Sequence, residues 1–202
     1  CSFDVTVNDN QAPQISGCPQ DISTANDAGD CSAMVSWSIP TVTDNCGVST
    51  IRANHNSNET FSVGVTTVTY TATDVNGNTA QCSFNITVTD NENPVITNCP
   101  SNITSPTDQN VCEASINWTV PSASDNCSVT SFNGSSTPGD IFELGTTNVS
   151  YTATDAAGNQ ATCSFTVTII DTEPPVINNC LSDLTFSTCL LYTSDAADES
   201  VC

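Results

Sequence analysis

The side chains best able to do chemistry in this chain are its 12 cysteines, most of which recur at one fixed spacing, the distance along the chain from Cys1 to Cys82. The equivalent cysteines are Cys1, Cys82 and Cys163; Cys18, Cys99 and Cys180; Cys31 and Cys112; and Cys46 and Cys127. Zinc is the competing use of regular cysteines, but short Cys-x-x-Cys pairs are absent and His55 is the only histidine. We therefore expect disulfides, formed in an oxidising compartment.

Acidic and amide side chains gather just before the prolines that separate the repeats. Residues 88–94 read Val-Thr-Asp-Asn-Glu-Asn-Pro, and residues 7–13 and 170–175 are similar. Calcium takes about six to eight oxygen ligands, which clustered Asp, Glu and Asn side chains supply, although such runs are also typical of plain turns. The ligands we expect for a Ca²⁺ ion, in the linkers and in loops at the same pole, are Asp9, Asn10, Asp44, Asp74, Asp90, Asn91, Glu92, Asp125 and Asp155.

Catalytic arrangements of residues are hard to find in this sequence. His55 is replaced by Ser136 at the equivalent position of the next repeat, and the chain has no glycine-rich phosphate loop. The chain carries 22 acidic residues and a single Arg or Lys, for a net charge of −21, which repels nucleic acids and anionic membrane surfaces. We expect a protein that is not an enzyme, binds no nucleic acid and does not insert into membranes.

Asn-x-Ser/Thr sequons are present, at about the frequency that the Asn, Ser and Thr content gives by chance. Three of them, at Asn85, Asn117 and Asn148, fall on outward phases of expected strands, where a glycan could be carried. The candidate glycosylation sites are Asn58, Asn85, Asn102, Asn117, Asn126, Asn133 and Asn148. Whether any of them is used depends on the enzymes of the host.

Alternation of apolar and polar residues at period two indicates the elements that position these side chains. The alternating apolar sets are Val35, Trp37 and Ile39; Val68, Tyr70 and Ala72; Phe84, Ile86 and Val88; and their equivalents in the next repeat. Such segments predict antiparallel strands with one buried face, separated by turns such as Asn76-Gly-Asn78. We expect an all-β chain of tandem immunoglobulin-like sandwiches stapled by disulfides, with the tryptophans in their cores.

Strand order helps to choose among the three pairings that four cysteines per repeat allow. In a sandwich, the corner after the second strand and the final hairpin lie at the same pole, which places Cys46 near Cys82. Cys82 is also in phase with the inward-facing Phe84. The expected disulfides are therefore Cys18–Cys31 and Cys46–Cys82 in one repeat, and Cys99–Cys112 and Cys127–Cys163 in the next.

A set of motifs in fixed order resembles the hyalin repeat (HYR) domain. The order is Pro-x-Ile-x-x-Cys-Pro, a second Cys, Trp-x-x-Pro, Asp-Asn-Cys, Thr-Tyr-Thr-Ala-Thr-Asp-x-x-Gly-Asn and Cys-Ser-Phe. The resemblance covers residues 10–171 and implies an immunoglobulin-like fold in extracellular, multi-repeat proteins associated with adhesion and matrix. It brings no catalytic residues.

These observations predict two full repeats with a fragment at each end. We expect the last strand of a preceding repeat at residues 1–9, repeats at 10–90 and 91–171, and the start of a further repeat at 172–202. Residues 190–199 fit no repeat position and resemble a translated sequencing adapter, so 190–202 is a candidate for non-native sequence. The pattern assigns no partner to Cys1, Cys180, Cys189 or Cys202.

The function that these features predict is an extracellular structural and adhesive array, either a semi-rigid spacer or a fibre component. Its partners would be neighbouring repeats of the same or identical chains, cell-surface or matrix proteins, or glycans. One alternative is a calcium-dependent module that binds carbohydrate or protein through its loops. Another is a filament subunit, joined by donation of the strand at residues 1–9 to the next subunit.

Overall fold

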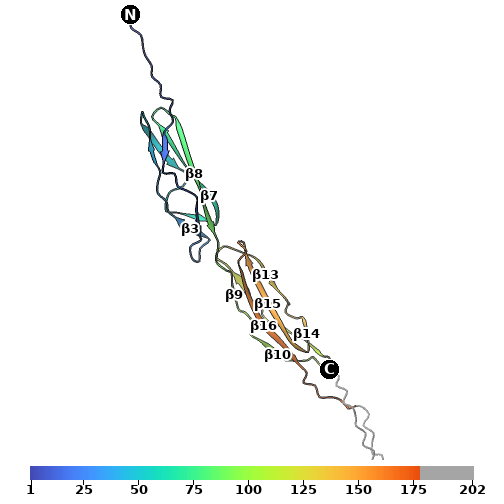
Figure 1. The fold of residues 1–202 in the computed structure, drawn as a ribbon. Helices are drawn as coiled ribbons and strands as arrows, with labels where there is room; N and C mark the ends of the chain where they lie inside the picture. Colours follow the sequence, from blue (N-terminus) through green and yellow to red (C-terminus); the bar gives the residue numbers. More distant parts are fainter. Residues whose placement is uncertain (178–202) are drawn as a thin grey trace, which may run out of the picture. The chain divides into compact units, whose positions relative to one another are not determined.

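The computed structural model describes residues 1–177 (Figure 1). The expectations for Cys180, Cys189 and Cys202, and for the stretch 190–202, lie outside these described residues. The chain divides into two compact units. Unit 1 contains Cys1–Val95, Ser124–Ser131 and Thr154–Ala161, and unit 2 contains the remaining residues. All regular elements within residues 1–177 are β-strands.

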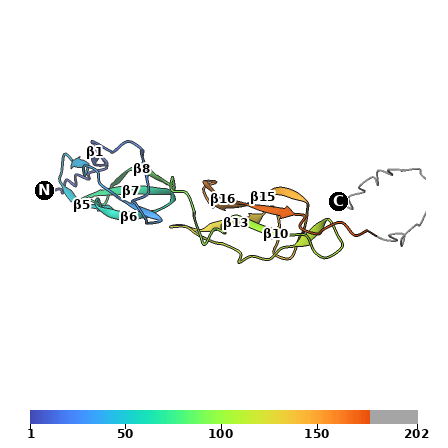
Figure 2. The same ribbon diagram turned by 90° about the horizontal axis from the view of Figure 1, so that it is seen from below.

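The first repeat has three sheets, and several of its strands are labelled in Figure 2. Its strands are β1 (Gln14–Ser16), β2 (Ile22–Ala25), β3 (Ser32–Val35), β4 (Thr41–Thr43), β5 (Val48–Ala53), β6 (Glu59–Ser62), β7 (Gly64–Asp74) and β8 (Thr79–Thr89). The four-stranded sheet has the order β2-β8-β7-β5, and β3 pairs with β6 and β1 with β4. Within the large sheet β2 runs parallel to β8, while the other neighbours are antiparallel.

The second repeat has the same arrangement. Its strands are β9 (Val95–Thr97), β10 (Ile103–Pro106), β11 (Glu113–Ser115), β12 (Ser122–Ser124), β13 (Val129–Gly134), β14 (Ile141–Glu143), β15 (Gly145–Asp155) and β16 (Gln160–Ile170). The four-stranded order is β10-β16-β15-β13, with β11 paired to β14 and β12 to β9. The expected fold class, all-β with immunoglobulin-like sandwiches, is confirmed.

The core of each repeat comes from the alternation that the sequence shows. Val68, Tyr70 and Ala72 in β7 are at most 4% exposed, and Phe84 and Ile86 in β8 are at most 3% exposed. The equivalent positions of β15 and β16 are buried in the same way. Burying these apolar side chains is the main favourable contribution to folding, since a Val, Ile or Phe side chain is worth about 1.5–3 kcal/mol when fully removed from water.

The tryptophan segments differ from the expected strands. β3 ends at Val35, so Trp37 and Ile39 lie beyond it, and Ile39 is 65% exposed. Trp37 is half-buried and packs against the core, with its ring centroid 5.3 Å from that of Phe84. Beyond β3 the backbone of Trp37 bonds to a side chain and not to a strand: its N–H donates to the Ser57 hydroxyl, and its carbonyl accepts from the same hydroxyl, both at 2.8 Å.

Residues 1–9 form no strand in this structure. Phe3, Val5 and Val7 are 75–89% exposed, whereas the equivalent side chains in β8 are buried. The strand expected here needs a neighbouring sheet edge for its backbone hydrogen bonds, and no other described strand pairs with it.

The predicted disulfides Cys18–Cys31, Cys46–Cys82, Cys99–Cys112 and Cys127–Cys163 are wrong. The structure joins Cys18 to Cys82 and Cys99 to Cys163. The reason is the parallel pairing of β2 with β8: Ile22 lies opposite Ile86, and four residues back along each chain this register brings Cys18 opposite Cys82. Cys82 itself lies inside β8, opposite Tyr70. Cys46 lies instead beside the hairpin between β7 and β8, where the N–H of Val75 donates to the carbonyl of Gly47.

The third disulfide joins Cys31 to Cys127, which belong to different repeats but to the same compact unit. Cys112, the equivalent of Cys31, also forms a disulfide. Cys1 and Cys46 are free. Each repeat therefore contributes cysteines to two kinds of bond, one that closes its own large sheet and one that links it to another repeat.

Candidate functional site

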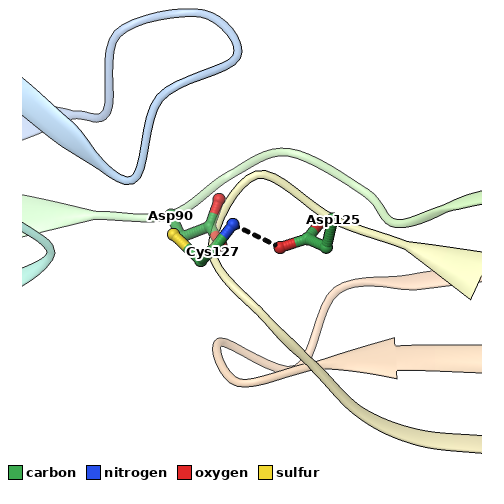
Figure 3. Close-up of side chains that lie close together, drawn as sticks. All are labelled: Asp90, Asp125 and Cys127. Atoms are coloured by element: carbon green, nitrogen blue, oxygen red, sulfur yellow. Dashed lines mark hydrogen bonds between the residues drawn. The ribbon is translucent and has the colours of Figure 1, made fainter.

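Two groups of acidic side chains occupy equivalent places in the two repeats. We call Asp9, Asp44 and Asp74 cluster 1, and Asp90, Asp125 and Cys127 cluster 2. Each residue of a cluster offers one potential ligand atom, and within a cluster these atoms all lie within 4.8 Å of one another. Figure 3 shows cluster 2, in which Asp90 and Asp125 approach the linker from different segments of unit 1.

Asp125 in cluster 2 is held by the turn that follows it. Its Oδ2 atom accepts hydrogen bonds from the backbone N–H groups of Cys127, at 2.9 Å, and Ser128, at 3.1 Å. This is the local turn that an Asp-Asn-Cys sequence favours, because a short carboxylate reaches the amides two and three residues ahead. The other oxygen, Oδ1, is buried and has no hydrogen-bond partner.

Asp90 ends the first repeat and is only 5% exposed. Its Oδ1 atom accepts the backbone N–H of Glu92 at 3.1 Å, while its buried Oδ2 has no partner. A buried, unpaired carboxylate oxygen is costly because it has lost its water. Asp90 and Asp125 in cluster 2 each keep one such oxygen, and a bound cation would relieve that cost.

Cys127 adds no metal ligand to cluster 2. Its sulfur is bonded to Cys31, and a metal-binding cysteine must be a thiolate. The protein groups available to a cation are therefore the oxygens of Asp90 and Asp125, which suit a hard ion such as Ca²⁺ that also keeps water ligands.

Cluster 1 repeats this arrangement with a third carboxylate. Asp44 Oδ1 accepts the N–H groups of Cys46 and Gly47, at 2.9 and 3.0 Å, and its buried Oδ2 has no partner. Asp9 accepts the N–H of Gln11 and the amide of Asn76, both at 3.1 Å. These two bonds, the backbone bond first, lower the pKa of Asp9 and favour its charged form.

Asp74 is 2% exposed and organises the hairpin between β7 and β8. Its Oδ1 accepts the N–H groups of Asn76 and Asn78, both at 2.8 Å, and its Oδ2 accepts the Asn78 amide at 2.7 Å. Burial by itself raises the pKa of Asp74, but the bonds from Asn78 and Asn76 outweigh it, so the net pKa is lowered. Gly77 supplies the positive φ, 94°, that this turn requires.

Asp155 plays the same part in the second hairpin. It is 2% exposed, and both of its oxygens are occupied by bonds from Gly158 and Asn159. Burial again raises its pKa while these bonds lower it, with a net lowering. Asp155 does not belong to cluster 2.

The remaining expected ligands do not join the clusters. Glu92 accepts the backbone N–H of Gly29 at 2.8 Å, so its carboxylate faces a loop of the first repeat. The side chains of Asn10 and Asn91 are exposed. Of the predicted metal ligands, the structure brings together Asp9, Asp44 and Asp74 in one place and Asp90 and Asp125 in another.

The sequons differ in how free their side chains are. Asn58, Asn102, Asn117, Asn133 and Asn148 are exposed, whereas Asn85 and Asn126 are partly covered. Asn85 and Asn102 accept hydrogen bonds at Oδ1, from the Thr67 hydroxyl and the Thr166 N–H, and not at the Nδ2 that would carry a glycan. The Nδ2 of Asn126 donates to the backbone carbonyl of Asp30. The five exposed asparagines therefore offer the more accessible amides for glycan attachment.

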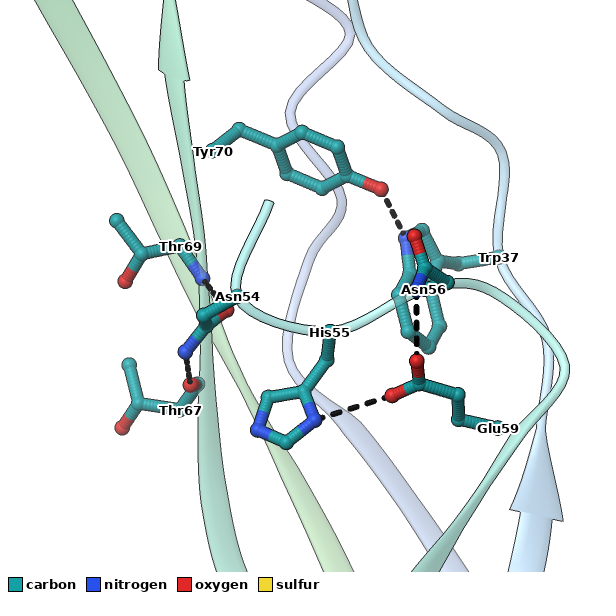
Figure 4. A network of polar contacts seen from close by, with 8 residues as sticks. All are labelled: Trp37, Asn54, His55, Asn56, Glu59, Thr67, Thr69 and Tyr70. Carbon is teal, nitrogen blue, oxygen red and sulfur yellow. Dashed lines mark hydrogen bonds and ion pairs between the residues drawn. The ribbon is translucent and has the colours of Figure 1, made fainter. Parts of the chain in front are cut away.

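His55 belongs to a structural network, shown in Figure 4. Its Nδ1 lies 3.1 Å from Glu59 Oε2, and its ring packs against Phe61 with a centroid distance of 5.3 Å. The neighbouring Asn54 bonds to the backbone of Thr67 and Thr69 in β7. These contacts hold the loop before β6 against the sheet.

No helix among the described residues is long and apolar enough to cross a membrane.

Comparison with known proteins places the chain in a family. The HYR domain model matches residues 8–88 and 89–169. Hyalin of Lytechinus variegatus is 41% identical over 152 residues, which are 72% of this chain and 28% of hyalin. Hyalin of Strongylocentrotus purpuratus is 34% identical over 194 residues, 91% of this chain and 16% of that protein.

A protein of Rattus norvegicus, "Sushi, von Willebrand factor type A, EGF and pentraxin domain-containing protein 1", is 40% identical over 167 residues. These cover 80% of this chain and 4% of the rat protein, so the chain spans a small part of its relatives.

Among solved structures, a protocadherin gammaB7 EC3-6 chain has a TM-score of 0.37 at 16% identity, over 81% of this chain and 52% of that one. A Drosophila N-cadherin EC1-4 chain has a TM-score of 0.34 at 14% identity, over 80% and 50%. Because the two family matches cover most of its length, the chain belongs to the HYR domain family, as a non-enzymatic tandem of two such domains.

Proposed function

We propose that this chain is a spacer in an extracellular adhesive array, and that Ca²⁺ binds where one repeat passes into the next. The observation that carries the proposal is the recurrence of a linker aspartate beside a turn aspartate in both repeats, Asp9 with Asp44 and Asp90 with Asp125, each pair with at least one buried oxygen that lacks a partner. A repeated site at each linker is what an extended array needs, because every junction then responds to the ion in the same way.

Charge supports the same proposal. A chain with net charge −21 repels itself at low ionic strength. Divalent cations held at Asp90 and Asp125 would neutralise part of that charge where segments converge. Membership of the HYR family and its relationship to hyalin support an extracellular, adhesion-related setting.

Calorimetric titration of the full chain with Ca²⁺ tests this proposal. We expect saturable binding that is weakened at least tenfold at one site by the double change Asp90→Asn and Asp125→Asn. The pair Asp9→Asn and Asp44→Asn should weaken the other. Mg²⁺ should bind less well, because it demands a smaller octahedral shell.

The control is Asp4→Asn, which removes one charge from an exposed residue outside both clusters. It should leave both sites intact. Binding that is absent in the unaltered chain, or that survives both double changes, would refute calcium binding at the clusters.

A second candidate function is subunit joining by strand donation, favoured by one observation. Phe3, Val5 and Val7 are exposed, although their equivalents Phe84, Ile86 and Val88 fill the core of the first repeat. Residues 1–9 thus present an apolar face that no described strand covers, and a sheet edge of another copy would accept them as an added strand.

A further inference from the structure

The disulfides whose two cysteines both lie in the described residues have two separations along the chain. Cys18–Cys82 and Cys99–Cys163 each have a sequence separation of 64, and Cys31–Cys127 has one of 96. In both kinds, the earlier cysteine belongs to the first half of a repeat. The later one lies in the last strand of the same repeat or in the Asp-Asn-Cys turn of the next.

Both free cysteines fit this rule as later members of a pair. Cys1 is the repeat equivalent of Cys82, and Cys46 is the equivalent of Cys127. Counted back from Cys1 and Cys46, the separations of 64 and 96 both lead to positions before residue 1. Each free thiol therefore has the place of a bonded cysteine while its partner position is outside this sequence.

The surroundings of Cys46 match those of bonded Cys127. The N–H of each cysteine donates at 2.9 Å to the aspartate two residues earlier, Asp44 or Asp125. The amide of the preceding asparagine lies 3.4 Å from the Cys46 sulfur and 3.7 Å from the Cys127 sulfur. The turn is thus preformed in the same conformation, and Cys46 differs in being exposed where Cys127 is partly covered.

The contacts around Cys31 show what such a partner offers. Beside the Cys31–Cys127 bond, the amide of Asn126 donates to the backbone carbonyl of Asp30 at 3.0 Å. Asn45 is the equivalent of Asn126 and is exposed. The backbone carbonyl that precedes a partner cysteine could therefore accept the amide of Asn45 while that cysteine bonds to Cys46.

We propose that Cys46 forms a disulfide with the cysteine at the Cys31 position of another HYR domain, one that precedes it in a longer chain, since the Cys31 of a second copy is already bonded to Cys127. Every domain would then be covalently tied to its neighbour through its Asp-Asn-Cys turn. In the reaction the two thiols lose their protons to solvent and become one S–S bond. Their two electrons pass to a disulfide oxidant such as glutathione disulfide, which is reduced to two thiols.

The test uses the complete chain and an extended chain, in which a second copy of residues 10–81 is joined directly before Cys1. The copy supplies one cysteine at a separation of 64 from Cys1 and another at a separation of 96 from Cys46, as in the observed bonds. Both proteins are oxidised with glutathione disulfide, free thiols are alkylated, and peptic digestion at low pH, where thiol exchange is suppressed, maps the bonds by mass spectrometry.

In the extended chain we expect Cys46 to be linked to the Cys31 of the added copy and to resist alkylation. Cys31→Ser in that copy should return Cys46 to full alkylation while Cys1 stays bonded to the added Cys18, which verifies folding. In the unextended chain we expect Cys46 to be alkylated, because the Cys31 of each copy is already bonded to Cys127; a Cys46 bond to a second copy there would contradict the assignment of the partner to the same chain.

The proposal would be overturned if Cys46 of the extended chain were still alkylated while the Cys1 and Cys127 bonds had formed. A bond from Cys46 to Cys1 would overturn it as well.

Discussion

At the scale of single residues, aspartates at turns do two different tasks in this chain. Asp74 and Asp155 are buried, and their oxygens are occupied by the hairpins that they stabilise. Asp44 and Asp125 bond to a turn with one oxygen and leave the other buried without a partner. The first pair therefore contributes to stability directly, and the second pair carries the capacity to bind a cation.

The hairpin aspartates predict a specific response to acid. Their folded-state pKa values lie below the ordinary 3.8, so the stabilisation that they provide is complete above about pH 5 and is lost as pH falls through the lowered pKa. Denaturant unfolding followed by tryptophan fluorescence from pH 7 to pH 2.5 measures this. The difference in free energy between the unaltered chain and the double variant Asp74→Asn, Asp155→Asn should shrink below about pH 4.

Comparison with the variant is needed because protonation also relieves the repulsion within a chain of net charge −21. Asp4→Asn, at an exposed position, should show no such change in the difference. A difference that stays constant down to pH 2.5 would contradict the role given to these carboxylates.

At the scale of elements, each sandwich is tied together by a tryptophan that lies outside the strands. The Nε1–H of Trp37 donates to the hydroxyl of buried Tyr70 at 2.8 Å (Figure 4), and Trp118 makes the same bond to Tyr151. This bond connects the segment after β3 to the middle of β7. It helps to keep both tryptophans packed against the core although β3 ends at Val35 and β11 at Ser115, before either tryptophan.

Removing the hydroxyl should destabilise one repeat at a time. Tyr70→Phe leaves the indole N–H of Trp37 without its acceptor, and we expect a loss of about 1–3 kcal/mol in the unfolding free energy of the first repeat. Denaturant unfolding with fluorescence detection measures the loss. Tyr151→Phe is the matched variant for the second repeat, and adding Trp37→Phe to Tyr70→Phe should cost less than the sum of the single changes. Strict additivity would argue against the bond.

At the scale of the whole molecule, repetition decides what the surface can do. Both repeats present the same turn and hairpin and a pair of equivalent carboxylates, Asp9 with Asp44 and Asp90 with Asp125, which suits multivalent contact better than a single specific pocket. The Cys31–Cys127 bond adds a covalent link between one repeat and the next. Such a link limits how far neighbouring repeats can separate when one of them unfolds.

The exposed segment 1–9 predicts self-association if strand donation operates. Sedimentation velocity over a hundredfold range of concentration should then show growing oligomers, because each added copy buries Phe3, Val5 and Val7. Val5→Asp should abolish them, since an inward-facing charge is costly to bury. Val65→Asp, at a similarly exposed side chain in β7, is the control. A chain that stays monomeric at all concentrations would exclude assembly by strand donation from residues 1–9.

The repeat period, the buried faces of the strands and the family all follow from the amino-acid sequence. Alternation identified Val68, Tyr70, Phe84 and Ile86 as core residues, because a strand of period two exposes its burial pattern locally. The acidic linkers and Asp-Asn-Cys turns also supplied the candidate carboxylates. These are short-range properties, so they can be read without knowing which strands are neighbours.

The pairing of the cysteines and the grouping of the carboxylates depend on the tertiary structure. Cys18 reaches Cys82 because β2 lies parallel to β8, a pairing between segments far apart in the sequence that no local pattern announces. Cys31 bonds to a cysteine of the next repeat, although the spacing alone favoured partners within one. Disulfides and ion sites depend on distance in space, and that distance is set by sheet order and not by the periodicity that defines each strand.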